Sequence, residues 1–160
     1  MGRFEQALQS ANQAIEETPS VDTFYITRSV IHRRMGNPQA AIDDASKAIS
    51  IATSVYKSKA MKSKVANSSK SDLDFAYISR GNARTQLQDY PGAIDDFTQA
   101  INLSPDGGQG YYGRGIAKKA LGDTHGAISD FEKAAEIYRQ RGYSAEYQDA
   151  VRQISLLRGK

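Results

Sequence analysis

A short sequence pattern occurs three times along this 160-residue chain. In each copy, a turn rich in glycine, asparagine or aspartate precedes an alanine at Ala41, Ala93 or Ala127. Ala93 and Ala127 are 34 residues apart, and Ala41 precedes Ala93 by 52 residues, which is 34 plus 18. A second alanine keeps the same spacing, at Ala14, Ala48, Ala100 and Ala134. A period of 34 with helix-type patterning predicts pairs of antiparallel helices, which must stack on their neighbours to bury their apolar faces.

Composition argues against catalysis. The chain has no cysteine, which excludes a disulfide framework, a thiolate nucleophile and a sulfur-ligated metal. Its two histidines, His32 and His125, are 93 residues apart in the sequence, and we expect both at the surface. We therefore predict no enzyme activity, no metal and no cofactor. No apolar run approaches the roughly 20 residues that span a bilayer, so we expect a soluble, cytoplasmic protein, unless a targeting signal precedes a fragment.

The spacing divides the chain into units of one helix pair each. The three complete units are residues 22–55, 74–107 and 108–141. Residues 1–21 are in register with the second helix of a unit whose first helix is missing. This predicts either a fragment of a longer protein or self-association through residues 1–20, because the apolar face of that helix has no partner.

The end of the chain, residues 142–160, predicts a capping helix. Gly142 can end the preceding helix, and Ser144 can cap a new one. Apolar residues then follow at helical spacing: Tyr147, Val151, Ile154 and Leu157.

The 18 extra residues, 56–73, form a lysine-rich insertion. Five lysines stand against the single Asp72: Lys57, Lys59, Lys62, Lys64 and Lys70. We expect the preceding helix to continue to about Ala66 and a loop to follow at residues 67–70. A charge run is usually a solvated face; the alternative is a docking element for an acidic partner or a lipid surface. Nucleic acid is disfavoured, since no arginines or aromatic residues are interleaved.

Each complete unit carries a tyrosine, an arginine and a small residue in its first helix and an aspartate in its second. The sets are Tyr25, Arg28, Ser29 and Asp44; Tyr77, Arg80, Gly81 and Asp96; and Tyr111, Arg114, Gly115 and Asp130. The small residue lets the second helix approach closely. We expect each arginine to pair with an aspartate of its own or the adjoining unit. The alternative is an arginine ladder that binds acidic ligands.

These features together resemble tetratricopeptide repeat (TPR) proteins over nearly the whole chain. Some stretches, such as residues 80–97 and 134–140, resemble the TPR proteins abundant in cyanobacteria, some of which assist photosystem assembly. The resemblance implies an all-α fold: a right-handed superhelical α-solenoid of stacked helix-turn-helix units with a C-terminal capping helix. It also implies a non-catalytic scaffold or adaptor that binds a peptide or helix of a partner protein, with protein assembly as one use. The alternative is a structural spacer or oligomerisation module of a larger protein.

The resemblance further implies a concave groove lined by first-helix residues. The candidate partner-binding residues at the matching positions are Thr23, Ile26, Thr27, Val30, Arg33, Arg34, Phe75, Ile78, Ser79, Asn82, Thr85, Gln86, Gln109, Tyr112, Ile116 and Lys119. They predict a mixed apolar and basic floor. TPR proteins that clamp the C-terminal carboxylate of chaperones use lysine, asparagine and arginine there. This chain instead has Ile26, Val30, Ser79, Gln109 and Gly113, so we do not expect it to bind that carboxylate.

Overall fold

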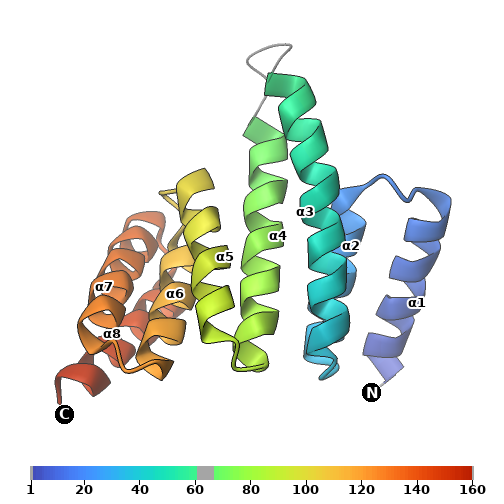
Figure 1. Cartoon of the computed structure of the whole chain (residues 1–160). Coiled ribbons are helices and arrows are strands. Elements are labelled where there is room, and N and C mark those ends of the chain that lie inside the picture. Colours follow the sequence, from blue (N-terminus) through green and yellow to red (C-terminus); the bar gives the residue numbers. More distant parts are fainter. Residues whose placement is uncertain (1, 61–66, 160) are drawn as a thin grey trace.

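The computed structural model describes residues 2–60 and 67–159, and every regular element in this part of the chain is an α-helix (Figure 1). The helices are α1 (Gly2–Glu17), α2 (Asp22–Arg34), α3 (Pro38–Ala60), α4 (Asn67–Gln86), α5 (Tyr90–Leu103), α6 (Gly108–Ala120), α7 (Thr124–Arg141) and α8 (Ser144–Arg158). Within the described ranges, no helix is long and apolar enough to cross a membrane.

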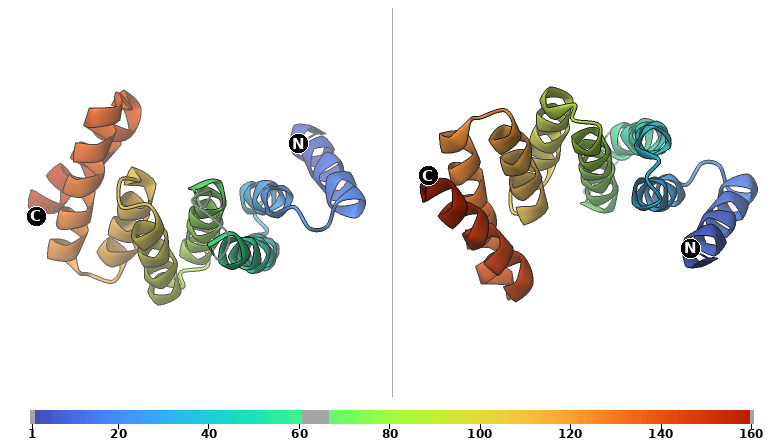
Figure 2. Two further views of the ribbon diagram at one scale, coloured as in Figure 1. Left: turned by 90° about the horizontal axis from the view of Figure 1, so that it is seen from above. Right: turned by 90° about the horizontal axis from the view of Figure 1, so that it is seen from below.

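The helices stack as pairs in a curved row, which confirms the expected all-α solenoid. α2 packs on α3, α4 on α5, and α6 on α7, while α3 contacts α4 and α5 contacts α6. The first helices of neighbouring pairs also touch, α2 with α4 and α4 with α6. Figure 2 shows α1 at one end of the row and α8, packed on α7, at the other. The division into repeat units stays a prediction.

The repeated alanines lie in the core between the helices of each pair. Ala41, Ala93 and Ala127 are fully buried, as are Ala48 and Ala134. A methyl side chain at these positions lets two helices approach closely without leaving a cavity.

Glycine and phenylalanine positions are matched across the pairs. An added Cβ at Gly81 would lie 2.9 Å from Phe97 Cε1, and one at Gly115 would lie 2.9 Å from Phe131 Cε1. The first pair has Ser29 at the position of these glycines, and there Ala45 replaces the phenylalanine. The serine hydroxyl donates to the Ala41 carbonyl at 2.8 Å. A small second-helix residue therefore makes room for a larger first-helix residue.

The turns between paired helices need a left-handed backbone. Gly36 and Gly122 have φ of 82° and 84°, and Gln88 has φ of 62° at the equivalent position. Asp89 then caps α5 by accepting from the Gly92 amide at 3.0 Å, a standard way to satisfy a free helical N–H group. The cap expected from Ser144 is wrong: Tyr143 is the N-cap of α8, with no side-chain cap hydrogen bond.

The insertion lengthens two helices rather than one. α3 runs 23 residues, to Ala60, and α4 already begins at Asn67. The loop expected at residues 67–70 is therefore wrong, because the Asn-Ser-Ser sequence there starts a helix, as these residue types favour. The expected continuation of α3 to Ala66 lies outside the described residues beyond Ala60. Figure 1 shows α3 and α4 projecting past the other helices.

Candidate functional site

Each arginine of the repeated set pairs with the aspartate of its own helix pair, which confirms the expected pairing. The distances from Nη2 to Oδ1 are 2.6 Å for Arg28–Asp44, 2.7 Å for Arg80–Asp96 and 2.8 Å for Arg114–Asp130. In every case Nε also donates to the carboxylate. The two-pronged geometry fits a guanidinium and a carboxylate, and the hydrogen bond that Arg28 donates to Asp44 raises the pKa of Arg28.

The same guanidiniums also join neighbouring helix pairs. Their Nη1 atoms donate to a polar side chain of the preceding second helix: Arg28 to Asn12, Arg80 to Ser46 and Arg114 to Thr98. Each guanidinium also lies 5.6–5.8 Å from the ring centre of the tyrosine three residues earlier, within reach of a cation–π contact. These arginines are thus engaged on several sides by the protein itself, which favours the structural role over a ladder for acidic ligands.

A second basic residue, one helical turn further along, faces each buried aspartate. Arg84 Nη1 lies 2.9 Å from Asp96 Oδ2, and Lys118 Nζ lies 2.8 Å from Asp130 Oδ2. His32 occupies this place in the first pair, with Nε2 3.8 Å from Asp44 Oδ2. His32 is therefore half-buried in an interhelical contact rather than on the open surface as expected, whereas His125 is exposed.

Several of the expected groove residues pack against the core clusters of the solenoid. Ile26 lies against the cluster containing Tyr25 and Ala76, and Ile78 lies against the Phe97 cluster. Ser79 is buried. Ile26 and Ser79 therefore contribute mainly to packing, whereas half-buried Ile78 packs on one side and keeps part of its surface open.

Three of the four α6 residues of the predicted groove lie against the α8 side of the structure, whereas the fourth, Gln109, is exposed. Tyr112 and Ile116 pack against the cluster that contains Phe131 and Leu157. Lys119 Nζ donates to Gln153 Oε1 of α8 at 2.8 Å. Contact with the chain's own last helix therefore occupies this part of the predicted surface.

The remaining expected residues are more open to solvent. Arg33 is half-buried, and burial is the main cause that lowers its pKa, with the charge of Arg34 adding to the effect. The threonines Thr27 and Thr85 turn their hydroxyls to backbone carbonyls of their own helices. Exposed or half-buried surface is also presented by Thr23, Val30, Arg34, Phe75, Asn82, Gln86 and Gln109.

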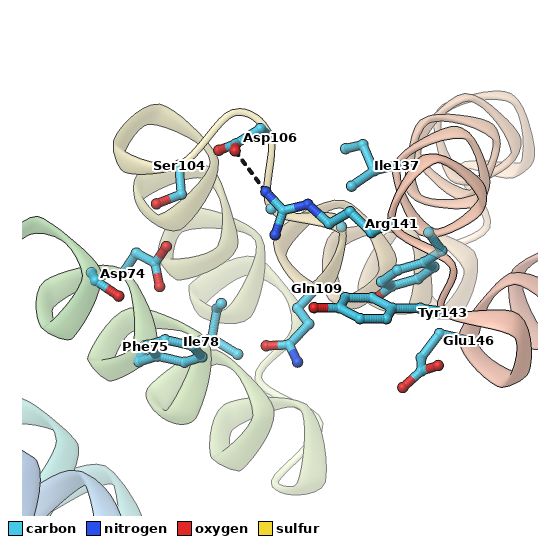
Figure 3. Close-up of a pocket in the computed structure, with 14 residues that line it drawn as sticks. Asp74, Phe75, Ile78, Ser104, Asp106, Gln109, Ile137, Arg141, Tyr143 and Glu146 are labelled. Carbon is cyan, nitrogen blue, oxygen red and sulfur yellow. Dashed lines mark hydrogen bonds and ion pairs between the residues drawn. The ribbon is translucent and has the colours of Figure 1, made fainter. Parts of the chain in front are cut away.

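A pocket of about 460 Å³ opens where the first turns of α6 and α8 meet α4 and the end of α7 (Figure 3). Three predicted residues line it: Phe75, Ile78 and Gln109. An adjoining hollow of about 260 Å³ shares Ile78 and Gln109 with the pocket and adds Asn82 and Tyr112. Together they form one groove across α4, α6 and α8. The predicted residues of α2 line neither hollow.

The rim of the pocket carries two exposed aromatic side chains. Phe75 is 48% exposed and Tyr143 is 50% exposed, and Gln109 lies between them (Figure 3). The three residues follow one another at the repeat spacing of 34 residues. Sequence reasoning missed Tyr143 because it treated the last segment only as a cap. Continuing the spacing from Gln109 by one more unit would have found it.

The described charged side chains of the pocket are mainly acidic, unlike the mixed apolar and basic floor that the sequence predicts. Within the described part of the chain, the pocket's ionisable side chains other than tyrosine are Asp74, Asp106, Glu146 and Arg141. Arg141 Nη2 already lies 2.6 Å from Asp106 Oδ2. The difference arises because the predicted basic residues lie at the C-terminal ends of their helices, whereas the pocket lies near the first turns of α6 and α8. Those turns attract acidic side chains.

A buried tyrosine forms part of the pocket wall. A Cβ added at Gly108 would lie 2.6 Å from Tyr138 Cε1, so the Tyr138 ring fills the space that a side chain there would need. Burial, followed by the nearby charge of Glu146, raises the pKa of Tyr138. The Tyr138 and Tyr143 ring centres lie 6.4 Å apart. Because Gly108 has no side chain, the Tyr138 ring can lie against α6 and form a wall of the pocket.

The described part of the chain contains no group of three or more His, Cys, Asp or Glu side chains that could hold a metal ion.

Comparisons with known proteins agree with the helix pairs. One family model, described as TPR repeat, matches residues 81–122 of this chain. A second model, described as Tetratricopeptide repeat, matches residues 108–141. The chain is 27% identical over 99 residues to dynein axonemal assembly factor 4 of Rattus norvegicus, covering 62% of this chain and 21% of that protein. It therefore spans about a fifth of that relative's length.

Solved structures share the fold over most of the chain. A crystal structure of MamA matches with a TM-score of 0.64 and 18% identity, covering 99% of this chain and 90% of that one. The second TPR domain of human RPAP3, in complex with the HSP70 peptide SGPTIEEVD, matches with a TM-score of 0.63 and 23% identity, covering 83% and 91%. The repeat matches and the stacked helix pairs together identify this chain as a tetratricopeptide repeat protein.

Proposed function

We propose that this chain is a non-catalytic scaffold that holds an extended segment of a partner protein in the groove across α4, α6 and α8. The observation that carries the proposal is the pair of exposed aromatic side chains, Phe75 and Tyr143, on the rim of a pocket of about 460 Å³. Exposed aromatic residues beside a concave site are typical anchors for a bound peptide. TPR domains are interaction modules, and the RPAP3 domain with the same fold carries a bound peptide.

The use of such a scaffold in protein assembly is part of the proposal. It draws support from the name of the relative, dynein axonemal assembly factor 4, which matches 62% of this chain. We place the protein in the cytoplasm. The acidic pocket argues against an acidic tail such as the peptide bound to RPAP3, since like charges repel. The groove residues Phe75, Ile78, Asn82 and Gln109 are the contacts that we propose.

Site-specific photocrosslinking tests the groove. A photoreactive phenylalanine analogue is placed at position 75, at 143, or at exposed Asp95 of α5 as the control. We expect positions 75 and 143 to crosslink one partner segment that position 95 does not reach. A synthetic peptide with the sequence of the crosslinked segment should then bind the Phe75→Ala/Tyr143→Ala variant at least about tenfold more weakly than it binds the parent chain. Equal crosslinking from position 95 would contradict binding in the groove and favour the role of a structural spacer.

The lysine-rich insertion is the alternative docking element. Of its lysine side chains, that of Lys57 is described and is exposed; those of Lys59, Lys62, Lys64 and Lys70 lie outside the described residues. Binding that survives the Phe75→Ala/Tyr143→Ala change but is lost when Lys57, Lys59, Lys62 and Lys64 become glutamate would move the site to the insertion.

Self-association through residues 1–20 is a second proposed contact. The expectation that the apolar face of α1 has no partner is wrong for Ala11 and Ile15, which are buried within the chain, but Phe4 is exposed and Leu8 is half-buried. Neighbouring exposed apolar side chains at the end of a helix favour association between molecules. Light scattering should give a mass above the monomer that falls to the monomer value in a Phe4→Ser/Leu8→Ser variant. A monomeric parent chain would end this proposal.

A further inference from the structure

The charge of the pocket decides which side chain of a partner it suits. Among the side chains that the structure describes, the carboxylates of Asp74, Asp106 and Glu146 line it together with the guanidinium of Arg141. Arg141 is already engaged with Asp106. Glu146 is exposed in the first turn of α8, next to Tyr143 of the aromatic rim (Figure 3). The pocket therefore attracts a positive charge and repels a negative one.

The aromatic rim suits the same kind of side chain. Phe75 and Tyr143 present open ring surface on either side of Gln109 (Figure 3), and the Tyr138 ring forms the wall behind Tyr143. An ammonium or guanidinium group is attracted to an aromatic face, while the alkyl stem of lysine or arginine packs on apolar surface. Carboxylates beside aromatic rings can thus hold both parts of a basic side chain.

The size and openness of the site also fit an inserted side chain. The pocket, at about 460 Å³, is large enough for a long side chain and continues into the hollow of about 260 Å³ through Ile78 and Gln109. A segment that places one side chain in the pocket can therefore lay its neighbours along Asn82 and Tyr112.

We propose that the pocket between α4, α6 and α8 receives a lysine or arginine side chain of the partner segment, with the charged group at Glu146 and the alkyl stem between Phe75 and Tyr143. The inference rests on the proposed function and names the chemistry of its ligand. The positive charge of this side chain is opposite in sign to the net charge of the acidic peptide in the RPAP3 complex.

Selection from a random 12-residue peptide library displayed on mRNA tests this assignment. Constant flanks on both sides keep free termini out of the pocket. We expect the enriched peptides to carry a lysine or arginine at one common position. Fluorescence anisotropy of the best peptide should show affinity about tenfold weaker for Glu146→Lys, the range expected when a charge-assisted hydrogen bond is lost. Glu146→Gln should weaken it less. Asp95→Lys, which makes the same charge change on α5, should leave the affinity within about twofold.

The outcomes separate this inference from the proposed function. Enriched peptides without a basic residue that still lose affinity on Phe75→Ala would overturn the basic-side-chain assignment and leave the groove proposal standing. Peptides insensitive to both Phe75→Ala and Glu146→Lys, or a selection that enriches nothing, would overturn both. Circular dichroism of each variant checks that the exposed substitutions leave the fold intact.

Discussion

The pair formed by Arg80 and Asp96 should contribute measurably to stability. Asp96 is only 2% exposed and Arg80 is 19% exposed, and the guanidinium donates to the carboxylate at 2.7 Å and 3.0 Å. A hydrogen bond to a charged group contributes about 1.5–3 kcal/mol. Arg84 also bonds Asp96 at 2.9 Å and keeps part of this stabilisation when Arg80 is removed. We therefore expect a coupling free energy of about 1–2 kcal/mol between the two residues.

A double-mutant cycle measures that coupling. Urea unfolding, followed by circular dichroism, is compared for the parent chain, Arg80→Ala, Asp96→Ala and the double variant. The exposed pair Arg141–Asp106, with side chains 44% and 78% exposed, serves as the matched control, and a solvated pair of this kind contributes about 0.2–1 kcal/mol. A coupling at Arg80–Asp96 below about 0.3 kcal/mol, which is within additivity error, would refute the structural role of these arginines.

Three further changes test the packing, the turns and the buried tyrosine. Gly113→Ala should destabilise by about 1–3 kcal/mol in the same unfolding assay, because its Cβ would lie 2.5 Å from Phe97 and overpack the core; an unchanged midpoint would contradict this. Gln88→Gly should stabilise by about 0.5–1 kcal/mol, since φ of 62° strains a residue with a side chain; a loss of stability would show that the Gln88 side chain contributes more than the strain costs. Burial raises the pKa of Tyr138 above its usual value of 10, so the unfolded chain loses that proton first and stability should fall as pH rises above about 10. Thermal midpoints at pH 9 and 11 should show a smaller fall in Tyr138→Phe, and an equal fall would argue against the buried hydroxyl.

The repeat architecture could be predicted because its signals are local and recur. Ala41, Ala93 and Ala127 mark sites where a larger side chain would separate two helices. Their recurrence in the sequence therefore indicates where helices pack closely. The Arg80–Asp96 pairing was predictable for the same reason: both residues recur at fixed places on two helices that must face each other.

Only the rim of the pocket could be predicted, because Phe75, Gln109 and Tyr143 recur every 34 residues, whereas its charged residues share no such pattern. It combines a helix-start position, Tyr143, with Asp106 in the turn after α5 and with Arg141 at the end of α7. Only the stacking of α6, α7 and α8 brings these together. The predicted groove also assumed that first-helix faces stay open, whereas α8 covers Tyr112 and Ile116. Whether a helix shields such a face depends on tertiary contacts, which periodicity does not report.

The close fit of Phe97 restricts the order in which these helix pairs can follow one another. Its ring lies against Gly81 of its own pair and Gly113 of the next. The position equivalent to Gly113 in α4 is Ser79, whose Cβ would meet the ring in a tandem copy of α4 and α5. Duplication of this pair would therefore need a compensating change to glycine at position 79 of the second copy. Neighbouring repeats in this protein are accordingly not interchangeable parts, and shuffled or consensus versions must exchange residues across a boundary as a set.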